Sequence, residues 1–295
     1  MRTKNLFVLM SLSMAFLIAI AGCNKTAEIT EPDLRMAEEE AIAEALFAEV
    51  LNDADDAGNL AHLNFYQNLK STAGQPSQPG APPVSGERTI TITPAEGQSE
   101  YPGFPKLITI QFNNYQVGQG RVKNGIIKIY VTGPLRLPNT TRIITFENYT
   151  IDGNLTEGKK TISNIDGINF TIKLEGGKIT FEDGTFILRQ MERNRKWIAG
   201  TNTPFFVWDD EFLISGFSSG VNRRGITFSH TIVEPLHKKM ACLWLVAGTI
   251  EMQNGNNLVV INYGQGECDN IATVTVNGET KEITLPLRPK QQQKP

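Results

Sequence analysis

Short runs of alternating apolar and polar residues fill the chain from Arg88 to about Leu287. In Leu107–Phe112, for example, Ile108 and Ile110 point to one side and Thr109 to the other. Strict alternation is typical of β-strands with one buried face and one wetted face. The same pattern predicts further strands at residues 89–93, 125–132, 141–151, 159–163, 168–175, 178–182, 185–190, 211–216, 225–233, 242–252, 258–263, 272–276 and 281–285.

Glycine-containing dipeptides separate these runs and indicate tight turns. They are Asp152-Gly153, Asp166-Gly167, Gly176-Gly177, Asp183-Gly184, Asn254-Gly255 and Asn277-Gly278. Asn-Gly and Asp-Gly between alternating runs are the strongest short-range signals for hairpins. A parallel sheet would need crossover helices, and no helical pattern interrupts the runs. The sequence therefore predicts an all-β domain, a large antiparallel meander, built either as a sandwich or as a strongly curved, half-barrel sheet.

One N-terminal helix is predicted before the strands, over residues 32–58. Ile42, Leu46 and Val50 repeat every four residues, and Gly58 is expected to end the helix. Acidic side chains occupy most of the remaining surface, which favours a solvated amphipathic helix packed on the domain. The alternative is a spacer or partner-binding helix between a membrane and the domain. A helix lying on a membrane surface is not expected, because its polar face is acidic.

Composition divides the chain into segments. Residues 71–86 are rich in Pro, Gly, Ser and Gln and carry no charge, which predicts an extended linker and a domain boundary. The predicted organisation is a signal peptide at 1–22, a tether at 23–31, the helix at 32–58, the linker at 71–86, the all-β domain at 87–287 and a disordered tail at 288–295.

The first residues have the pattern of an export signal. Two basic residues precede the apolar run Leu6–Ile20, which is too short to span a bilayer comfortably. The following Ala21-Gly22-Cys23 resembles a bacterial lipobox, which implies a lipid-modified Cys23; the alternative is an ordinary signal peptide. By resemblance to lipoprotein sorting rules, Asn24 implies the outer membrane and leaves the leaflet open. Acyl chains on Cys23 would make the membrane a partner.

Charge is distributed unevenly along the 295 residues. Residues 23–58 carry 11 acidic and two basic side chains, whereas residues 59–295 carry 24 basic and 20 acidic ones. Neither segment has basic residues clustered with aromatic ones, so nucleic-acid binding is not expected. With 40% hydrophobic residues the chain can form a sizeable core.

Cys242 and Cys268 remain once Cys23 is set aside. In an exported chain, two cysteines on neighbouring predicted strands favour a disulfide. The alternative is a pair of free thiols. A redox role is not expected without a closely spaced pair.

No catalytic residue, metal site or cofactor is predicted. His62, His230 and His237 lack metal-ligand spacing, and no serine lies in a nucleophile-elbow pattern. Asn52–Gly58 lacks the ligands that a calcium loop needs.

The densest acidic cluster of the domain is Asp209-Asp210-Glu211. Adjacent strand residues point to opposite faces, so this triplet does not form a convergent pair. Basic side chains that precede it can neutralise it across a hairpin: Arg189, Arg193, Arg195 and Lys196.

Aromatic side chains crowd the segment between residues 197 and 208. Trp197, Phe205, Phe206 and Trp208 either cap one end of the β core or offer ring faces on which sugars could stack. Trp197, Trp208 and Phe205 are the predicted ligand contacts.

The closing run Tyr263–Asn270, followed by Val276-Asn277-Gly278, together with the lipobox Cys23 and the acidic N-terminal segment, resembles lipoproteins of Bacteroidota. That resemblance implies no activity or catalytic residue. The predicted function is a non-enzymatic, lipid-anchored protein of the cell envelope that binds or scaffolds a carbohydrate or protein partner. The alternatives are a surface glycan-binding protein and a hydrolase with an unrecognised site.

Overall fold

The computed structural model describes residues 31–67, 83–117, 120–203, 206–254 and 257–285. The predicted signal peptide, Cys23 and the tail 288–295 lie outside the described residues. The elements are α1 (Glu31–Gln67), β1 (Val84–Pro94), β2 (Lys106–Val117), β3 (Lys123–Val131), β4 (Thr140–Ile151), β5 (Asn154–Asn164), β6 (Asn169–Thr180), β7 (Phe186–Ala199), the 3₁₀ turn η1 (Val207–Asp209), β8 (Glu211–Val221), β9 (Thr227–Lys239), β10 (Ala247–Asn254), β11 (Asn257–Gln265), β12 (Ile271–Val276) and β13 (Glu279–Thr284).

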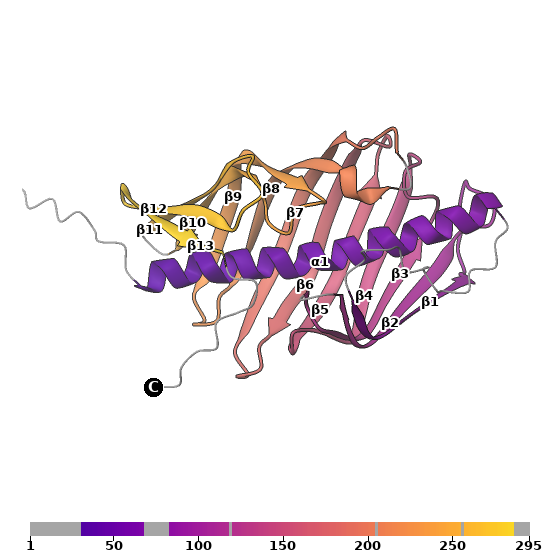
Figure 1. Ribbon diagram of the computed structural model, residues 1–295, viewed down its shortest axis with the longest axis horizontal. Helices are drawn as coiled ribbons and strands as arrows, with labels where there is room; N and C mark the ends of the chain where they lie inside the picture. Colours follow the sequence, from indigo (N-terminus) through magenta and orange to yellow (C-terminus); the bar gives the residue numbers. More distant parts are fainter. Residues whose placement is uncertain (1–30, 68–82, 118–119, 204–205, 255–256, 286–295) are drawn as a thin grey trace, which may run out of the picture.

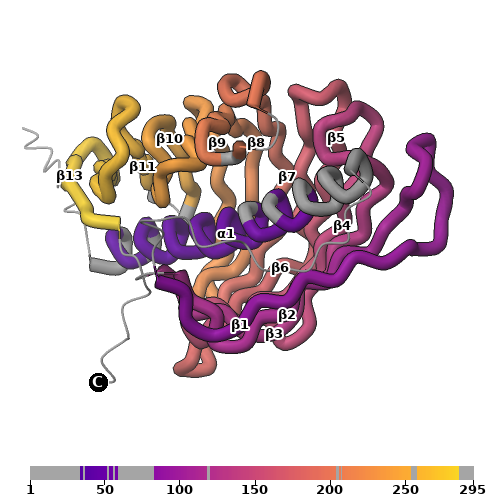
Figure 2. Tube along the Cα trace, turned by 45° about the vertical axis from the view of Figure 1, so that its right-hand side comes forward, coloured from indigo at the N-terminus to yellow at the C-terminus, as the bar shows by residue number. Residues whose placement is uncertain are grey.

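All 13 strands form one antiparallel sheet in which every strand pairs with its neighbours in the sequence, from β1 to β13. The predicted antiparallel meander and the single N-terminal helix are therefore confirmed, and the meander is one sheet rather than a two-sheet sandwich. Helix α1 lies across the strands on one face of this sheet (Figure 1). It contacts β2 near one end of the sheet and β11 and β12 near the other, and Figure 2 shows the strands passing around it.

The hydrophobic core lies between α1 and the face of the sheet that it covers. Leu46 and Val50 on the helix are fully buried, and they belong to the same cluster as Ile127, Ile144 and Ile250 on the strands. The predicted apolar spacing of the helix therefore does face the sheet. Because the helix supplies part of the core of the β domain, it belongs to that domain and is not a separate spacer.

The helix is longer than predicted. It continues through Gly58 to Gln67, so the prediction that Gly58 ends it is wrong. A Cβ atom at this position would lie 2.3 Å from Cδ1 of Leu135, which indicates that glycine allows a close approach here rather than a helix stop. The predicted linker is also too long, because β1 begins at Val84.

Two predicted strand boundaries need correction. Gly176-Gly177 is not a hairpin turn: β6 runs through it, and the register with β7 shifts between Leu174 and Gly177, which marks a bulge. The run 242–252 is not a strand throughout, because β10 begins only at Ala247. The residues just before β10 form a loop.

Other predicted turns are present. Asp152-Gly153 joins β4 to β5, and Asn277-Gly278 joins β12 to β13. All four residues have positive φ angles, as a two-residue hairpin turn of this kind requires. The predicted disulfide between Cys242 and Cys268 is present, with a Cα–Cα distance of 5.7 Å. Within the described part of the chain, no helix combines the length and apolar character that crossing a membrane requires.

Candidate functional site

The face of the sheet that α1 covers carries basic side chains. Along β7 every second residue is buried, and the buried positions include Arg189, Arg193 and Arg195 beside Ile187 and Met191. The acidic residues of α1 meet this basic face. The predicted solvated acidic face is therefore wrong, since the helix uses several of its carboxylates as buried ion-pair partners.

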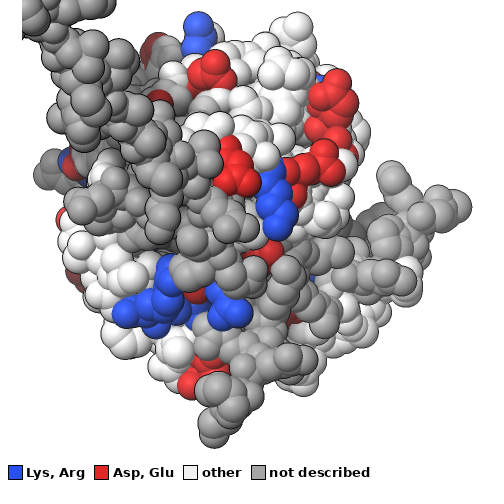
Figure 3. Space-filling model, turned by 90° about the vertical axis from the view of Figure 1, so that its left-hand side faces the viewer, with Lys and Arg blue, Asp and Glu red and all other residues white. Residues whose placement is uncertain are grey.

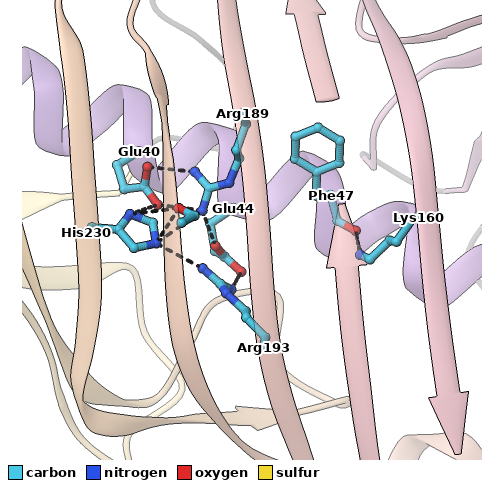
Figure 4. A network of polar contacts seen from close by, with 8 residues as sticks. Glu40, Glu44, Phe47, Lys160, Arg189, Arg193 and His230 are labelled. Atoms are coloured by element: carbon cyan, nitrogen blue, oxygen red, sulfur yellow. Dashed lines mark hydrogen bonds and ion pairs between the residues drawn. The ribbon is translucent and has the colours of Figure 1, made fainter. Parts of the chain in front are cut away.

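The central ion-pair cluster joins α1 to β7 and β9 (Figure 4). Arg189 donates two hydrogen bonds to the Glu40 carboxylate, at 2.7 and 2.8 Å, and a third at 3.1 Å to Glu44. Arg193 also donates to Glu44. Burial alone would raise the pKa of Glu40, but Arg189 and His230 outweigh it and hold that pKa well below its usual range.

His230 completes this cluster as a neutral imidazole. Burial lowers its pKa. Its Nδ1 lies 2.9 Å from Glu40, while its Nε2 lies 2.6 Å from Oγ of Ser218 and 3.3 Å from a guanidinium nitrogen of Arg193. Because the guanidinium can only donate, Nε2 is the acceptor and Nδ1 carries the proton that goes to Glu40.

Ser218, His230 and Glu40 have the spacing of a nucleophile, a base and an orienting carboxylate. Their surroundings do not suit that role. Ser218 and His230 are each 1% exposed, and neither lines any of the described pockets. We therefore interpret the trio as a structural network that fixes α1 on β8 and β9.

Two more clusters follow along the helix. Lys123 on β3 contacts both oxygens of Asp53, at 2.7 and 2.8 Å, and also Glu49. Asp55 pairs with Arg142 and Arg195. Burial raises the pKa of Asp53 despite the ammonium group beside it. Each cluster ties a carboxylate of α1 to a different part of the sheet.

The largest described pocket lies beside the same helix. It has an empty volume of about 610 Å³. Most of its lining is apolar: Ala41, Ala45, Ala48, Ile214, Leu243, Trp244, Leu245 and Leu285, with Glu44, Arg121, Lys238 and Tyr263 as the polar members. Arg121 precedes β3 and Tyr263 lies on β11, so distant parts of the sheet meet at this pocket.

The loop before β10 forms one wall of the pocket through Leu243 and Leu245. The disulfide from Cys242 fastens this loop to Cys268, in the connection between β11 and β12.

On the outer surface at this end of the molecule, basic and acidic side chains are interspersed among the described residues in view (Figure 3). Several carboxylates of α1, by contrast, have their ion-pair partners inside, between the helix and the sheet.

Two polar groups at this pocket lack a matching partner among the described residues: the ammonium of Lys238 lacks an opposite charge, and the hydroxyl of Tyr263 lacks a hydrogen bond. The ammonium of Lys238 donates to the backbone carbonyls of Cys242 and Leu243 and forms no ion pair with a described residue. Burial lowers its pKa to about 8, with Glu49 opposing the shift. The buried hydroxyl of Tyr263 has no hydrogen-bond partner in the described part of the chain.

A second pocket, of about 520 Å³, adjoins the first, and both are lined by Glu44, Ala48, Ile214 and Lys238. Lys160 on β5 also lines it, and its ammonium donates to the backbone carbonyl of Phe47 at 2.9 Å. Burial lowers the pKa of Lys160 to about 7. Two buried lysines without a described ion-pair partner therefore border one apolar region.

Of the three predicted aromatic contacts, the two that the structure describes differ sharply in exposure. Trp197 on β7 is 6% exposed and belongs to the buried side of that strand, where the ring of Phe212 on β8 stacks on it. Trp208, in η1, is 62% exposed. Phe205 lies outside the described residues. Trp197 and Trp208 therefore do not form a joint stacking surface. Among the described aromatic side chains of this segment, Trp208 and Phe206 are the accessible ones.

The predicted acidic cluster is divided as well. Asp209 is exposed, Asp210 turns inward to Arg136 at 3.2 Å, and Glu211 pairs with His237 at 2.7 Å. The expectation that the arginines of β7 neutralise this cluster is wrong for Arg189 and Arg193, which pair with the helix. Among the described residues, no group of three potential ligands is placed to hold a metal ion. The side chain of His62 is not among those described.

Sequence reasoning missed Lys160, Lys238 and Tyr263. The sequence carried a signal of burial only for the arginines of β7. They occupy the same odd-numbered positions as Ile187 and Trp197, which face the covered side of the sheet. Comparison with protein-family models, with curated proteins and with solved structures found no match. The resemblance to Bacteroidota lipoproteins therefore stays a prediction.

Proposed function

We propose that this chain is a lipid-anchored binding protein of the cell envelope, and that the apolar pocket beside α1 holds an amphipathic carboxylic acid. The observation that carries this proposal is the position of Lys238. Its ammonium borders an apolar pocket and has only backbone carbonyls as described partners. A buried cation without an opposite charge is costly, and a ligand carboxylate would supply that charge.

The two ends of such a ligand would meet matching surfaces. A carboxylate can accept hydrogen bonds from the Lys238 ammonium and from the unpaired hydroxyl of Tyr263. The alkyl chain would pack on Leu243, Trp244 and Leu245, with about 0.8 kcal/mol of stabilisation for each CH₂ group removed from water.

Calorimetric titration of the mature chain with dodecanoate and with dodecanol, below the concentration at which either self-associates, tests the proposal. The two probes share a chain length and differ in charge. Dodecanoate is expected to bind at one site and about tenfold or more tightly than dodecanol, because a hydrogen bond to a charged group contributes about 1.5–3 kcal/mol. Absence of binding by dodecanoate would overturn the proposal.

Two variants separate the contribution of charge from that of space. Lys238→Met is expected to weaken dodecanoate about tenfold and to leave dodecanol unchanged. Ala48→Phe, at a position that lines both adjoining pockets, should weaken both probes. Lys173→Met is the control, because Lys173 is exposed and pairs with Glu192 on the outer face. Wild-type affinity in Ala48→Phe, with the fold intact by circular dichroism, would contradict this location.

The anchoring part of the proposal rests on the lipobox resemblance at Cys23. Intact-mass analysis of protein extracted from membranes should give a chain that begins at Cys23 and carries acyl mass. A mature chain without that mass, or one that begins elsewhere, would contradict it.

Glycan binding is the second candidate function. It is favoured by one observation: Trp208 and Phe206 are 62% and 56% exposed on neighbouring parts of one loop. Affinity electrophoresis against a polysaccharide panel tests it. Retardation that Trp208→Ala abolishes would support glycan binding, and retardation that this variant leaves unchanged would exclude Trp208 as the contact.

A further inference from the structure

A third pocket lies at the ends of the central strands, and Lys238 is not among the residues that line it. Its empty volume is about 330 Å³. It shares no lining residue with the pocket of about 610 Å³, and it shares Arg195 and Phe212 with the adjoining pocket of about 520 Å³. Helix α1, the loop between β3 and β4, and strands β4, β6, β7 and β8 contribute to it. Its lining consists of Asp55, Leu135, Arg136, Arg142, Phe170, Arg195, Trp197, Asp210 and Phe212.

Four buried polar atoms on these residues make no well-formed hydrogen bond in the described part of the chain, although the Trp197 indole interacts with the Asp210 carboxylate and opposes the rise that burial causes in the pKa of that carboxylate. They are Nη1 of Arg136, Nε of Arg195, Nε1 of Trp197 and Oδ1 of Asp210. Buried polar groups in folded proteins are nearly always satisfied, and an unpaired one costs about 1–3 kcal/mol. The guanidinium N–H groups of Arg136 and Arg195 are left without any such partner among the described residues, and a polar molecule would complete the pocket.

The charges at this pocket select the kind of molecule. Three guanidinium groups face two carboxylates: Asp55 pairs with Arg142 and Arg195, and Asp210 pairs with Arg136. One positive charge is therefore left over. Arg136 also lies over the Trp197 ring, at 4.0 Å from its centroid, and this covered ring face is not available to a sugar.

We propose that this pocket is a binding site for a small free hydroxycarboxylate. The ligand carboxylate would accept hydrogen bonds from the unpaired N–H groups of Arg136 and Arg195, beside the Trp197 indole. A hydroxyl on the adjacent carbon would donate to Oδ1 of Asp210. The net charge of the bound pocket would then be zero. The site is separate from the one proposed for amphipathic acids, and either can fail without the other.

Titration of ¹⁵N-labelled protein with glycolate tests this site through the indole N–H signal of Trp197. The chain has three tryptophans, and Trp197→Phe assigns the signal. Glycolate is expected to shift it saturably, whereas glycolamide, which has the same shape without the charge, is expected to leave it in place. Absence of a shift, or an equal shift with glycolamide, would overturn the proposal.

The variant Arg136→Met is expected to abolish the glycolate shift or to weaken binding at least tenfold. Arg223→Met is a matched control, because Arg223 also pairs with an aspartate, Asp183, and lies 4.1 Å from the centroid of an aromatic ring, Phe181. A saturable shift that survives Arg136→Met but not Arg223→Met would place the anion elsewhere. If Arg136→Met alters the fold, Arg136→Lys, which keeps the charge, should retain weaker binding.

Discussion

Lys160 places an ammonium group in the interior beside a backbone carbonyl, and burial lowers its pKa from 10.5 to about 7. Between these two values the unfolded chain binds a proton that the folded chain releases, so stability should rise with pH. Lys160→Met should therefore stabilise the protein by a few kcal/mol at pH 7 and by progressively less towards pH 10. Urea unfolding of both proteins across this range measures the difference.

Lys159→Met is the control for this prediction. Lys159 is the adjacent residue, but it is exposed on the outer face and pairs with Glu175 at 2.8 Å. Its replacement should change stability by less than about 1 kcal/mol at any pH in the range. A Lys160→Met effect that is equally small, or that does not depend on pH, would show that the ammonium is not buried as described.

Gly58 gives a second test at the scale of a residue. Replacing an exposed helical glycine with alanine stabilises a helix by about 1 kcal/mol. Here the new Cβ would lie 2.3 Å from the buried side chain of Leu135, so Gly58→Ala should destabilise the protein by about 1–3 kcal/mol. Thermal unfolding measures this change. The double variant Gly58→Ala with Leu135→Ala should show a stabilising coupling energy, and simple additivity would contradict the contact.

At the residue scale, the sequence predicted which side of a strand a residue points to better than it predicted which residue it pairs with. The alternation along β7 was visible, and its odd positions carry both Ile187 and Arg189. The rule that charged residues face water assigned the arginines wrongly, because their carboxylate partners lie about 140–150 residues away on α1. Long-range pairing of this kind leaves no local signal.

The helix is the element that the sheet is arranged around, and charge fixes it in place. Glu40 lies at the centre of this contact, with Arg189 1% exposed beside it. Glu40→Gln keeps the shape and the helix propensity but removes the charge. It should destabilise the protein by about 3–5 kcal/mol, because a buried guanidinium loses its main partner. Chemical denaturation at neutral pH measures this effect.

The matched control is Glu175→Gln, which breaks an exposed pair with Lys159 and should change stability by at most about 1 kcal/mol. Acid adds an independent check. The pKa of Glu40, Glu44 and Asp55 is lowered in the folded state, so their stabilisation is complete above their ordinary pKa and is lost as pH falls below it. Equal losses of unfolding free energy in Glu40→Gln and Glu175→Gln would contradict the role given to Glu40.

At the element scale, the apolar repeat of Ile42, Leu46 and Val50 predicted the helix and its buried side correctly. Its end was not predictable, because Gly58 has the same local signature whether it stops a helix or allows close packing. Hairpin turns such as Asp152-Gly153 were predictable, since their backbone angles favour those residues locally. Gly176-Gly177 was not, because only the neighbouring strands decide between a turn and a bulge.

At the scale of the whole molecule, alternation required one buried face for each strand but did not say what covers that face. A second sheet and a helix satisfy the same pattern, which explains why the sequence left both a two-sheet sandwich and a single curved sheet open. The pockets were equally hidden, since Arg121 and Tyr263 meet only after the whole sheet has formed around α1. The disulfide was predictable because it joins neighbouring segments at the C-terminal end.

That disulfide ties the wall of the largest described pocket to the rest of the sheet, so its removal should affect both stability and binding. Cys242 and Cys268 are 26 residues apart, and the chain-entropy model assigns such a loop about 3–4 kcal/mol. The double variant Cys242→Ala with Cys268→Ala should lose about this much stability in urea unfolding. Leu243 and Leu245 would no longer be held over α1 in this variant. Dodecanoate should therefore bind the double variant less tightly than the wild-type chain. Unchanged affinity together with lost stability would mean that the loop holds its place without the bridge, and that the disulfide acts on the unfolded chain alone.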